Sequence, residues 1–506
     1  MSTRAAADAS SHPGAGRGPV AWRPVLLAGA AAGLLLTALS GGYGYHRDEL
    51  YFRMLPPGWG YVDQPPLTPW LARISSEVVA DEVWALRLAA TAATVCTVVV
   101  IALLTRELGG GRLAQTASAW GYAGAASTLM FGHVLLPATL DLLLWAAIAL
   151  AAARAALNDP RWWLVAGSLI GLTTSNRWLV AVLAVGIALG VLLTGPRSAL
   201  RSPWLWAGAG AALLLTVPNL VFQAMNGWPQ LAMGAALGDN NAAEVRTQMW
   251  LLLVLLLGPP LVPVWLWGLA HLLRARELRA ARFLVVSFVV VLAFTFVSGA
   301  QAHYFIGLLT VLFAAGCVPL GRLLERRPRW RPWVGAVIAL NGVVSTVLAL
   351  PVLPETVLAR TPVPDISPLV ADQVGWPRYV EQVGAAYQQA LELDGGLPPD
   401  QVAVITSNYG EAGAIARYGA EHGLPDPLSG HNHLHGLARP ADSVRVVVLV
   451  GGQSRAVSEY FETCREVDEL DNGTGVDNEE QGRPIMVCQG PEERWGQLWP
   501  RFAHLD

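Results

Sequence analysis

Two neighbouring carboxyl side chains are the first residues in this sequence that could do chemistry. Asp48 and Glu49 follow an apolar run long enough to be a membrane helix, so we expect them just beyond its end. A carboxylate at a membrane surface can act as a general base toward a hydroxyl or an amine. The same acids can instead cap a short helix from Glu49 to Met54, because negative charge stabilises a first helical turn. The residues alone leave both interpretations open.

A second polar cluster follows in the same segment. It contains Tyr61, Asp63 and Gln64, and two consecutive prolines come directly after it. Paired prolines fix backbone angles and stiffen a loop. A stiff loop suits a site that must hold its geometry, so these side chains are candidates for a binding pocket.

Asp141 is a third candidate, because it lies in an otherwise apolar run. An ionisable side chain inside a membrane helix is costly and is therefore a functional candidate by default. The alternative is that Asp141 complements the dipole of a helix that begins near Pro137. The ends of other apolar runs carry His303, Tyr304 and Arg177. Tyrosine is also common there as an interfacial residue.

The elements that would position these side chains are membrane helices. Hydrophobic residues make up 53% of the 506 residues and charged residues 14%, whereas soluble domains usually carry about 25% charged residues. Lipid must therefore cover part of the surface, and about 20 apolar residues span a bilayer core. We predict a polytopic α-helical membrane protein with about eleven transmembrane helices, at residues 24–41, 83–104, 113–131, 136–155, 162–176, 178–194, 203–222, 248–272, 283–299, 304–320 and 332–350.

Arginine distribution predicts the orientation of these spans. Alternate loops are rich in arginine: Arg106 and Arg112; Arg154 and Arg161; Arg197 and Arg201; Arg274, Arg276, Arg279 and Arg282; Arg322, Arg326, Arg327, Arg329 and Arg331. Positively charged loops tend to stay in the cytoplasm. This places a tail at residues 1–23 in the cytoplasm and the C-terminus outside it, with long outer loops at 42–82 and 224–247 around a membrane domain at 24–350.

The segment 351–506 is polar and predicts a separate domain outside the cytoplasm. Strands are expected at 401–406 and 443–450 and a helix at 411–422, an alternation typical of an α/β domain. Cys464 and Cys488 both lie in this segment, and whether they pair stays open. His431, His433 and His435 either form a metal site or lie in a solvated loop, which is the commoner case. The segment carries no glycine-rich nucleotide fingerprint.

Several motifs together resemble the polyprenol-phosphate-sugar-dependent glycosyltransferases of the GT-C class. The similarity is to the glycosyltransferase family 39-like branch, related to protein O-mannosyltransferases and the lipid A aminoarabinose transferase. The motifs extend along nearly the whole chain: DELY at 48–51, GYVDQPPLTPWLAR at 60–73, TLD at 139–141, NRW at 176–178, PNLVFQAMNGWP at 218–229, AHYF at 302–305, NYGEA at 408–412 and SGHN at 429–432.

The resemblance implies a role for each candidate residue. Asp48 would be the catalytic base with Glu49 as its acidic partner. The donor phosphate would be bound by Arg177, Arg246 and Tyr304. The remaining candidates would shape the acceptor and donor pocket: Tyr61, Asp63, Gln64, Asp141 and His303. The chain departs from many relatives at Gln64 and Gln301, near or at positions where those relatives carry lysine.

The expected activity is transfer of a hexose or pentose, with inversion, from a polyprenyl-phosphate donor to an acceptor on the outer face of the plasma membrane. We expect no cofactor and no nucleic acid partner; a divalent metal requirement stays open. The acceptor is an envelope protein, lipid or glycan that the sequence does not identify. Two other classes stay open: a transporter or flippase of lipid-linked sugars, and a non-catalytic membrane protein that binds an envelope ligand.

Overall fold

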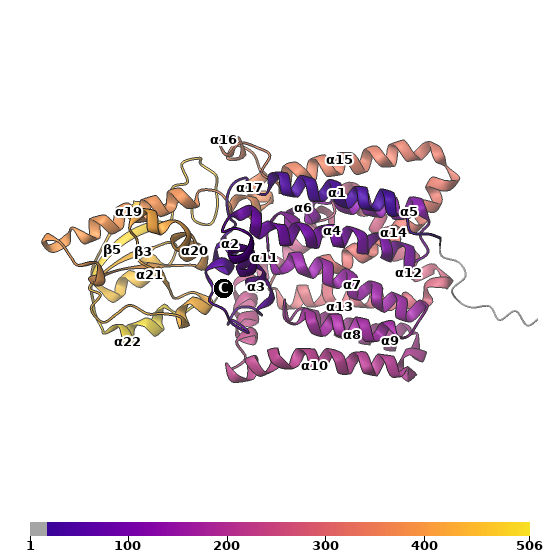
Figure 1. Cartoon of the computed structure of the whole chain (residues 1–506), viewed down its shortest axis with the longest axis horizontal. Helices are drawn as coiled ribbons and strands as arrows, with labels where there is room; N and C mark the ends of the chain where they lie inside the picture. Colours follow the sequence, from indigo (N-terminus) through magenta and orange to yellow (C-terminus); the bar gives the residue numbers. More distant parts are fainter. Residues whose placement is uncertain (1–17, 506) are drawn as a thin grey trace, which may run out of the picture.

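The computed structural model describes residues 18–505 and has two parts, a helical bundle and an α/β tail domain (Figure 1). Most of the predicted N-terminal tail at 1–23 lies outside the described residues. The main helices of the bundle are α1 (Trp22–Leu39), α4 (Val83–Glu107), α5 (Arg112–Ala123), α6 (Ala126–His133), α7 (Pro137–Leu157), α8 (Trp162–Thr173), α9 (Val180–Thr194), α10 (Pro203–Met225), α11 (Pro229–Leu255), α12 (Val262–Arg274), α13 (Phe283–Ser298), α14 (Ile306–Arg326) and α15 (Arg331–Ala349).

Lipid, rather than water, is the natural surrounding of this bundle. The central helix α14 is buried on nearly every side, for example at Leu309 and Phe313, whereas Leu213 and Leu214 of the outer helix α10 are 67% and 71% exposed. Within residues 18–505, six helices are long and apolar enough to cross a membrane, or seven if the bent pair α11 and α12 counts as one span. Helices α8, α9 and α13 are shorter apolar helices. The chain is therefore a multi-pass helical protein, and the number eleven stays a prediction.

Two predicted segments have a different structure. The predicted outer loop at 224–247 is mostly helix, because α11 begins at Pro229 and continues through the polar residues Asp239, Asn240, Asn241 and Glu244. The predicted span at 248–272 is not continuous: the chain bends by 74° between α11 and α12. Pro259 and Pro260 lie at this break, and proline lacks the N–H that would continue the helical hydrogen bonds.

The segment 42–82 is the part of the membrane domain closest to the tail domain. It contains α2 (Arg47–Met54), α3 (Leu67–Ile74) and the π-helical turn η1 (Ser75–Val79). Helix α2 begins two residues earlier than predicted, with His46 as its N-cap. His46 Nδ1 accepts from the backbone N–H of Asp48 at 3.2 Å, and Glu49 Oε2 accepts from the backbone N–H of His46 at 2.9 Å.

The tail domain is built on one mixed sheet. Its strands are β1 (Val402–Thr406), β2 (Leu428–Ser429), β3 (Val446–Val450), β4 (Phe461–Glu469) and β5 (Pro484–Pro491), in the order β2-β1-β3-β5-β4. β1 is parallel to β2 and β3, and β5 is antiparallel to β3 and β4. The predicted α/β character is confirmed, including the two predicted strands and a helix after the first, α20 (Tyr409–Tyr418).

Helices cover both faces of this sheet. Val404 and Val448 pack against α19 (Trp376–Leu391) on one face. On the other face, Ile405 and Leu449 share a core with Trp495 of α22 (Trp495–Leu498). The domain also contains the short helices α16 (Glu355–Leu358), α17 (Val363–Ile366), α18 (Pro368–Ala371) and α21 (Ser454–Val457).

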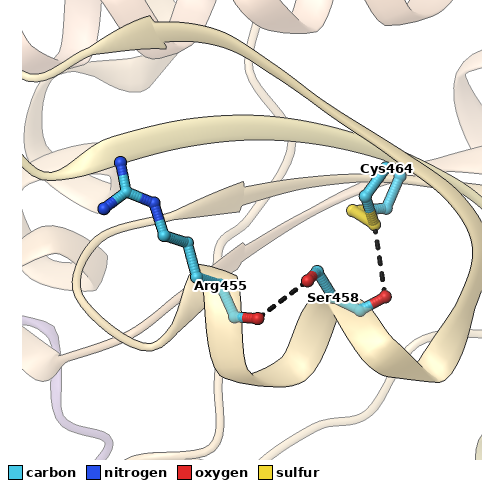
Figure 2. The surroundings of a disulfide bond; sticks show 4 residues. Arg455, Ser458 and Cys464 are labelled. Carbon is cyan, nitrogen blue, oxygen red and sulfur yellow. Dashed lines mark hydrogen bonds between the residues drawn. A yellow bond between two sulfur atoms is a disulfide. The ribbon is translucent and has the colours of Figure 1, made fainter.

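Cys464 and Cys488 form a disulfide between β4 and β5, where they are directly opposite partners in the sheet. Figure 2 shows that the turn before β4 lies against this bond: Ser458 Oγ donates to the carbonyl of Arg455 at 2.7 Å, and the carbonyl of Ser458 lies 3.5 Å from Cys464 Sγ. The disulfide sulfur has no proton to donate, so the second contact is not a hydrogen bond. The pairing that the sequence left open is thereby resolved.

Candidate active site

A cavity of about 490 Å³ lies where the bundle, the 42–82 segment and the tail domain meet. One part of its wall is polar: Asp48, Asp63, Gln64, Asn176, Arg177, Gln230, Gln301, Tyr304, Tyr409 and Asn432. The other part is apolar and comes from α9, α11 and α13 with the residue before α9: Leu179, Val182, Leu231, Met233, Leu237 and Phe294. The cavity therefore suits a molecule with a polar head and an apolar chain.

Asp48 lies in the first turn of α2, and its carboxylate faces the cavity. Its side chain is 27% exposed, and its Oδ1 accepts a hydrogen bond from the hydroxyl of Tyr409 in the tail domain at 2.9 Å. Because the helix is capped through His46 and Glu49, this carboxylate is not used for capping. Asp48 is thus available to a ligand in the cavity.

Glu49 points away from the cavity into the bundle. Its carboxylate is fully buried and forms an ion pair with Arg87 of α4, Oε2 to NH2 at 2.9 Å. Oε1 also accepts from the backbone N–H of Leu135 at 2.9 Å. The acidic partner implied by the family resemblance therefore anchors α2 to the bundle and does not line the cavity.

Asp63 is the second carboxyl group of the cavity wall. Its Oδ1 accepts from the hydroxyl of Tyr51 at 2.9 Å. Burial raises the pKa of Asp63 to about 6, with a smaller contribution from the negative charge of Asp48, although the Tyr51 hydrogen bond acts in the opposite direction. The charge of the cavity wall thus changes near pH 6.

Arg177 lies in the break between α8 and α9, where two side chains contact it. Its Nε is 3.6 Å from Asp141 Oδ2, and its guanidinium carbon is 5.8 Å from the ring centroid of Tyr304. Asp141 is itself fixed, because its Oδ1 accepts from Asn176 Nδ2 at 2.8 Å. The acid predicted in the apolar run is therefore close to a cation and orients it at the edge of the cavity.

Known proteins resemble this chain in sequence and in structure. A profile of the family described as dolichyl-phosphate-mannose-protein mannosyltransferase matches residues 63–222, which include Asp63, Asp141 and Arg177. No curated protein matches the sequence significantly. ArnT from Cupriavidus metallidurans in the apo state matches the structure with a TM-score of 0.56 at 13% identity, over 95% of this chain and 99% of that chain. The chain has the GT-C glycosyltransferase fold.

Two further structures support the same fold. ArnT from Cupriavidus metallidurans bound to undecaprenyl phosphate gives a TM-score of 0.53 at 13% identity, over 93% of this chain and 98% of that chain. The mycobacterial arabinofuranosyltransferase AftD gives 0.51 at 12% identity, over 94% of this chain but 40% of that chain. The resemblance indicated by the sequence motifs is therefore confirmed, and the C-terminal tail domain is included in the match to ArnT.

Three of the residues predicted to belong to the site, Arg246, Tyr61 and His303, lie outside the cavity wall. Arg246 donates to the carbonyl oxygens of Phe296 and Val297 at 3.1 and 3.4 Å and is not part of the cavity wall. Tyr61 is buried beside the cavity and donates its hydroxyl to the carbonyl of Pro56 at 2.8 Å. Neither residue contacts the space that Asp48 and Arg177 share.

His303 also lies behind the wall, next to Tyr304 and Asp141. Burial and the nearby charge of Arg177 lower the pKa of His303 to about 3, so its ring is neutral at pH 7. Gln64 and Gln301 both line the cavity. Gln64 Nε2 and Gln301 Oε1 are buried and make no hydrogen bond to the described residues.

The three histidines of the tail loop do not converge. His431 stacks between Tyr409 and His504, with ring centroids 4.8 Å from each. His433 meets the edge of Tyr61 at 5.1 Å, and His435 stacks on Trp499 at 5.4 Å. Within residues 18–505, no group of three His, Cys, Asp or Glu side chains has the arrangement of a metal site.

Five residues that shape the site were not among the predicted site residues: Arg87, Asn176, Gln230, Tyr409 and Asn432. Arg87 lies in an apolar run of the sequence. Its position could have predicted an ion pair, because a charge inside a membrane helix needs a partner. Tyr409 and Asn432 belong to tail motifs that the sequence analysis had noted. Their position in the cavity wall depends on the docking of two domains, which no local pattern encodes.

Proposed function

We propose that the protein is a membrane glycosyltransferase that moves a sugar from a polyprenyl-phosphate donor to an acceptor on the outer face of the plasma membrane. The observation that carries this proposal is that a single cavity contains Asp48, Arg177 and an apolar wall. These are the groups that a lipid-linked phosphosugar and its acceptor require. The binding of undecaprenyl phosphate by ArnT, which has the same fold, supports a donor of this class.

The proposed reaction proceeds through proton transfer, attack on the anomeric carbon and departure of the phosphate. The Asp48 carboxylate takes the proton of an acceptor hydroxyl or amine, and the freed lone pair forms a bond to the anomeric carbon. The bond between that carbon and the phosphate oxygen breaks, and polyprenyl phosphate leaves with the electron pair. Attack from the side opposite to the phosphate inverts the anomeric centre.

Arg177 stabilises the leaving phosphate in this scheme. A guanidinium can donate two parallel hydrogen bonds to phosphate oxygens, and these strengthen as negative charge develops. Asp141 and Asn176 orient it, and Tyr304 packs beside it. The apolar wall of α9, α11 and α13 accommodates the first part of the polyprenyl chain.

Two observations support an outer location for this chemistry. The arginine-rich loops lie at the end of the bundle away from the tail domain (Figure 1), as expected if that end faces the cytoplasm. The Cys464–Cys488 disulfide lies in the tail domain, and disulfides persist mainly in oxidising compartments. Nucleotide sugars are not accessible there, so a lipid-linked donor is required.

The test is sugar transfer from radiolabelled polyprenyl-phosphate sugars to envelope fractions, with wild type and Asp48→Asn at matched expression. Asparagine keeps an oxygen for the Tyr409 hydroxyl but is not a base, so we expect transfer to fall by about 100-fold or more. Asp426→Asn, an exposed acid of the tail domain, is the control and should transfer normally. Fractionating the labelled product identifies the acceptor.

A second candidate function is transport of lipid-linked sugars, favoured by the bent pair α11 and α12, since transporters often use broken helices. Transport needs no general base. Equal labelling by wild type and Asp48→Asn would reject the assigned base, and movement of the intact donor without transfer would favour the transporter.

A further inference from the structure

The tail domain contacts the membrane domain through a helix that lies directly on α2. A Cβ atom added to Gly413 of α20 would lie 2.7 Å from the backbone carbonyl carbon of Leu50, and one added to Gly410 would lie 2.9 Å from Cβ of Arg47. Arg47 also forms an ion pair with Glu479 of the tail domain. The two helices therefore approach without intervening side chains, which fixes the start of α20 above the cavity.

The side chain at that start is Tyr409, and three side chains pack against its ring. It stacks on Tyr51 of α2 with ring centroids 4.7 Å apart and on His431 at 4.8 Å. The guanidinium of Arg47 lies 4.9 Å from the ring centroid. A ring enclosed in this way has little freedom to rotate, so the direction of its hydroxyl is set by the fold.

That hydroxyl donates to Asp48 Oδ1 at 2.9 Å, and Tyr409 itself lines the cavity. We propose that Tyr409 is a positioning residue, whose hydroxyl holds the Asp48 carboxylate in the orientation needed to take the acceptor proton. The tail domain thereby completes the catalytic site of the membrane domain. This inference rests on the proposed function, in which Asp48 is the base.

The hydrogen bond has one consequence for a general base. It fixes one carboxylate oxygen, which leaves the other oxygen for the acceptor. A Tyr409→Phe variant keeps the ring stack but loses this hydrogen bond.

Labelling of carboxyl groups tests the hydrogen bond without relying on catalysis. Carbodiimides react with protonated carboxyl groups, and peptide mass spectrometry locates the products. For the full-length protein in detergent at one fixed pH, we expect Asp48 to be labelled about two- to threefold more in Tyr409→Phe, because the hydroxyl no longer occupies one of its oxygens. Tyr418→Phe, at the other end of α20, should match wild type. Equal labelling of wild type and Tyr409→Phe would overturn the proposal.

Sugar transfer then tests the consequence for the reaction. We expect Tyr409→Phe to lower kcat by about tenfold with little change in the KM for the donor, because the hydroxyl donates to Asp48. Normal transfer by this variant, when Asp48→Asn is inactive, would overturn the positioning role and leave the proposed function intact. Absence of transfer by wild type with every donor would reject both.

Discussion

Among single residues, Asp63 makes the charge of the cavity wall depend on pH. Its pKa is raised to about 6 by burial, whereas an unfolded aspartate ionises near pH 3.9. Between these two values the folded protein binds more protons than the unfolded chain, so stability falls as the pH rises through this window. We expect the Tm of wild type to fall by about 1–2 °C more than that of Asp63→Asn between pH 4 and pH 6.5.

Thermal unfolding of the detergent-solubilised protein across this pH range measures the difference. Other acids also titrate here, and comparison with Asp63→Asn removes their contributions because both proteins contain them. Asp426→Asn should retain the wild-type pH dependence. Parallel curves for wild type and Asp63→Asn would mean that Asp63 is ionised throughout the range.

Arg177 and Arg246 were both predicted to bind phosphate, and their surroundings now distinguish them. Arg177 lines the cavity, whereas Arg246 donates to carbonyl groups of α13. We expect Arg177→Gln to weaken binding of undecaprenyl phosphate by about 10- to 100-fold, the usual effect of losing a charged hydrogen bond. Arg246→Gln should bind like wild type. The ligand-dependent increase in Tm gives the affinity.

Removing Arg177 leaves the Asp141 carboxylate buried without its cation, and an unpaired buried charge destabilises the fold. The double variant Arg177→Gln with Asp141→Asn removes both charges and controls for this effect. If the double variant binds as tightly as wild type, the phosphate does not lie at Arg177. Arg177→Lys should bind undecaprenyl phosphate more weakly than wild type and more tightly than Arg177→Gln, because an ammonium group keeps the charge but lacks the planar pair of donors.

The candidate site could be predicted in part from residue types. The sequence identified Asp48, Asp63, Arg177 and Asp141 as candidates, and the structure brings the first three to one cavity with Asp141 behind Arg177. It did not show which of Asp48 and Glu49 faces the cavity. Successive helical residues point about 100° apart, so only one of the two can do so, and the orientation of the helix decides which. The face of α2 that meets the bundle is set by Arg87, 38 residues later in the chain.

At the scale of elements, the contact between α20 and α2 determines whether the tail domain can reach the site. Gly413 lies where an added methyl group would meet the backbone of α2 at 2.7 Å. We expect Gly413→Ala to displace α20, lengthen the Tyr409–Asp48 hydrogen bond and lower sugar transfer by about tenfold. Overpacking of this kind also costs about 1–3 kcal/mol of stability, which thermal unfolding measures.

Gly436→Ala is the matched control, because a Cβ atom there meets nothing within 4 Å. It should change neither Tm nor transfer. If Gly413→Ala transfers normally while its Tm falls, α20 can shift without disturbing the base, and the contact serves stability alone.

Elements were predictable where one physical signal dominated. Continuous apolar runs gave α4, α7 and α14, and buried valine-rich segments gave β1 and β3. Strand β4 was missed because most of its residues are exposed and most of its charged residues come in adjacent pairs, so apolar and polar residues do not alternate along it. Helix α11 was taken for a loop because Asp239, Asn240 and Asn241 interrupt its apolar pattern, although polar residues do not by themselves end a helix.

At the scale of the whole molecule, charge is distributed unequally between the two ends. The arginine-rich loops contact one another at the end away from the tail domain: Arg154 pairs with Glu107 at 3.5 Å and Arg322 with Glu277 at 3.7 Å. Partial neutralisation by these acids still leaves a large excess of arginine at that end. The predicted orientation therefore rests on the sum over five loops, and no single loop decides it.

Cysteine labelling in intact cells tests this orientation. Ala441→Cys places a thiol on an exposed loop of the tail domain, and Ser198→Cys places one in the exposed arginine-rich turn after α9. Both are made in a Cys96→Ala background, since Cys96 is exposed and Cys317 is buried. We expect a membrane-impermeant maleimide to label Ala441→Cys in intact cells and Ser198→Cys only after permeabilisation. The opposite pattern would place the cavity on the cytoplasmic side, where nucleotide sugars are available and the argument for a lipid-linked donor would no longer hold.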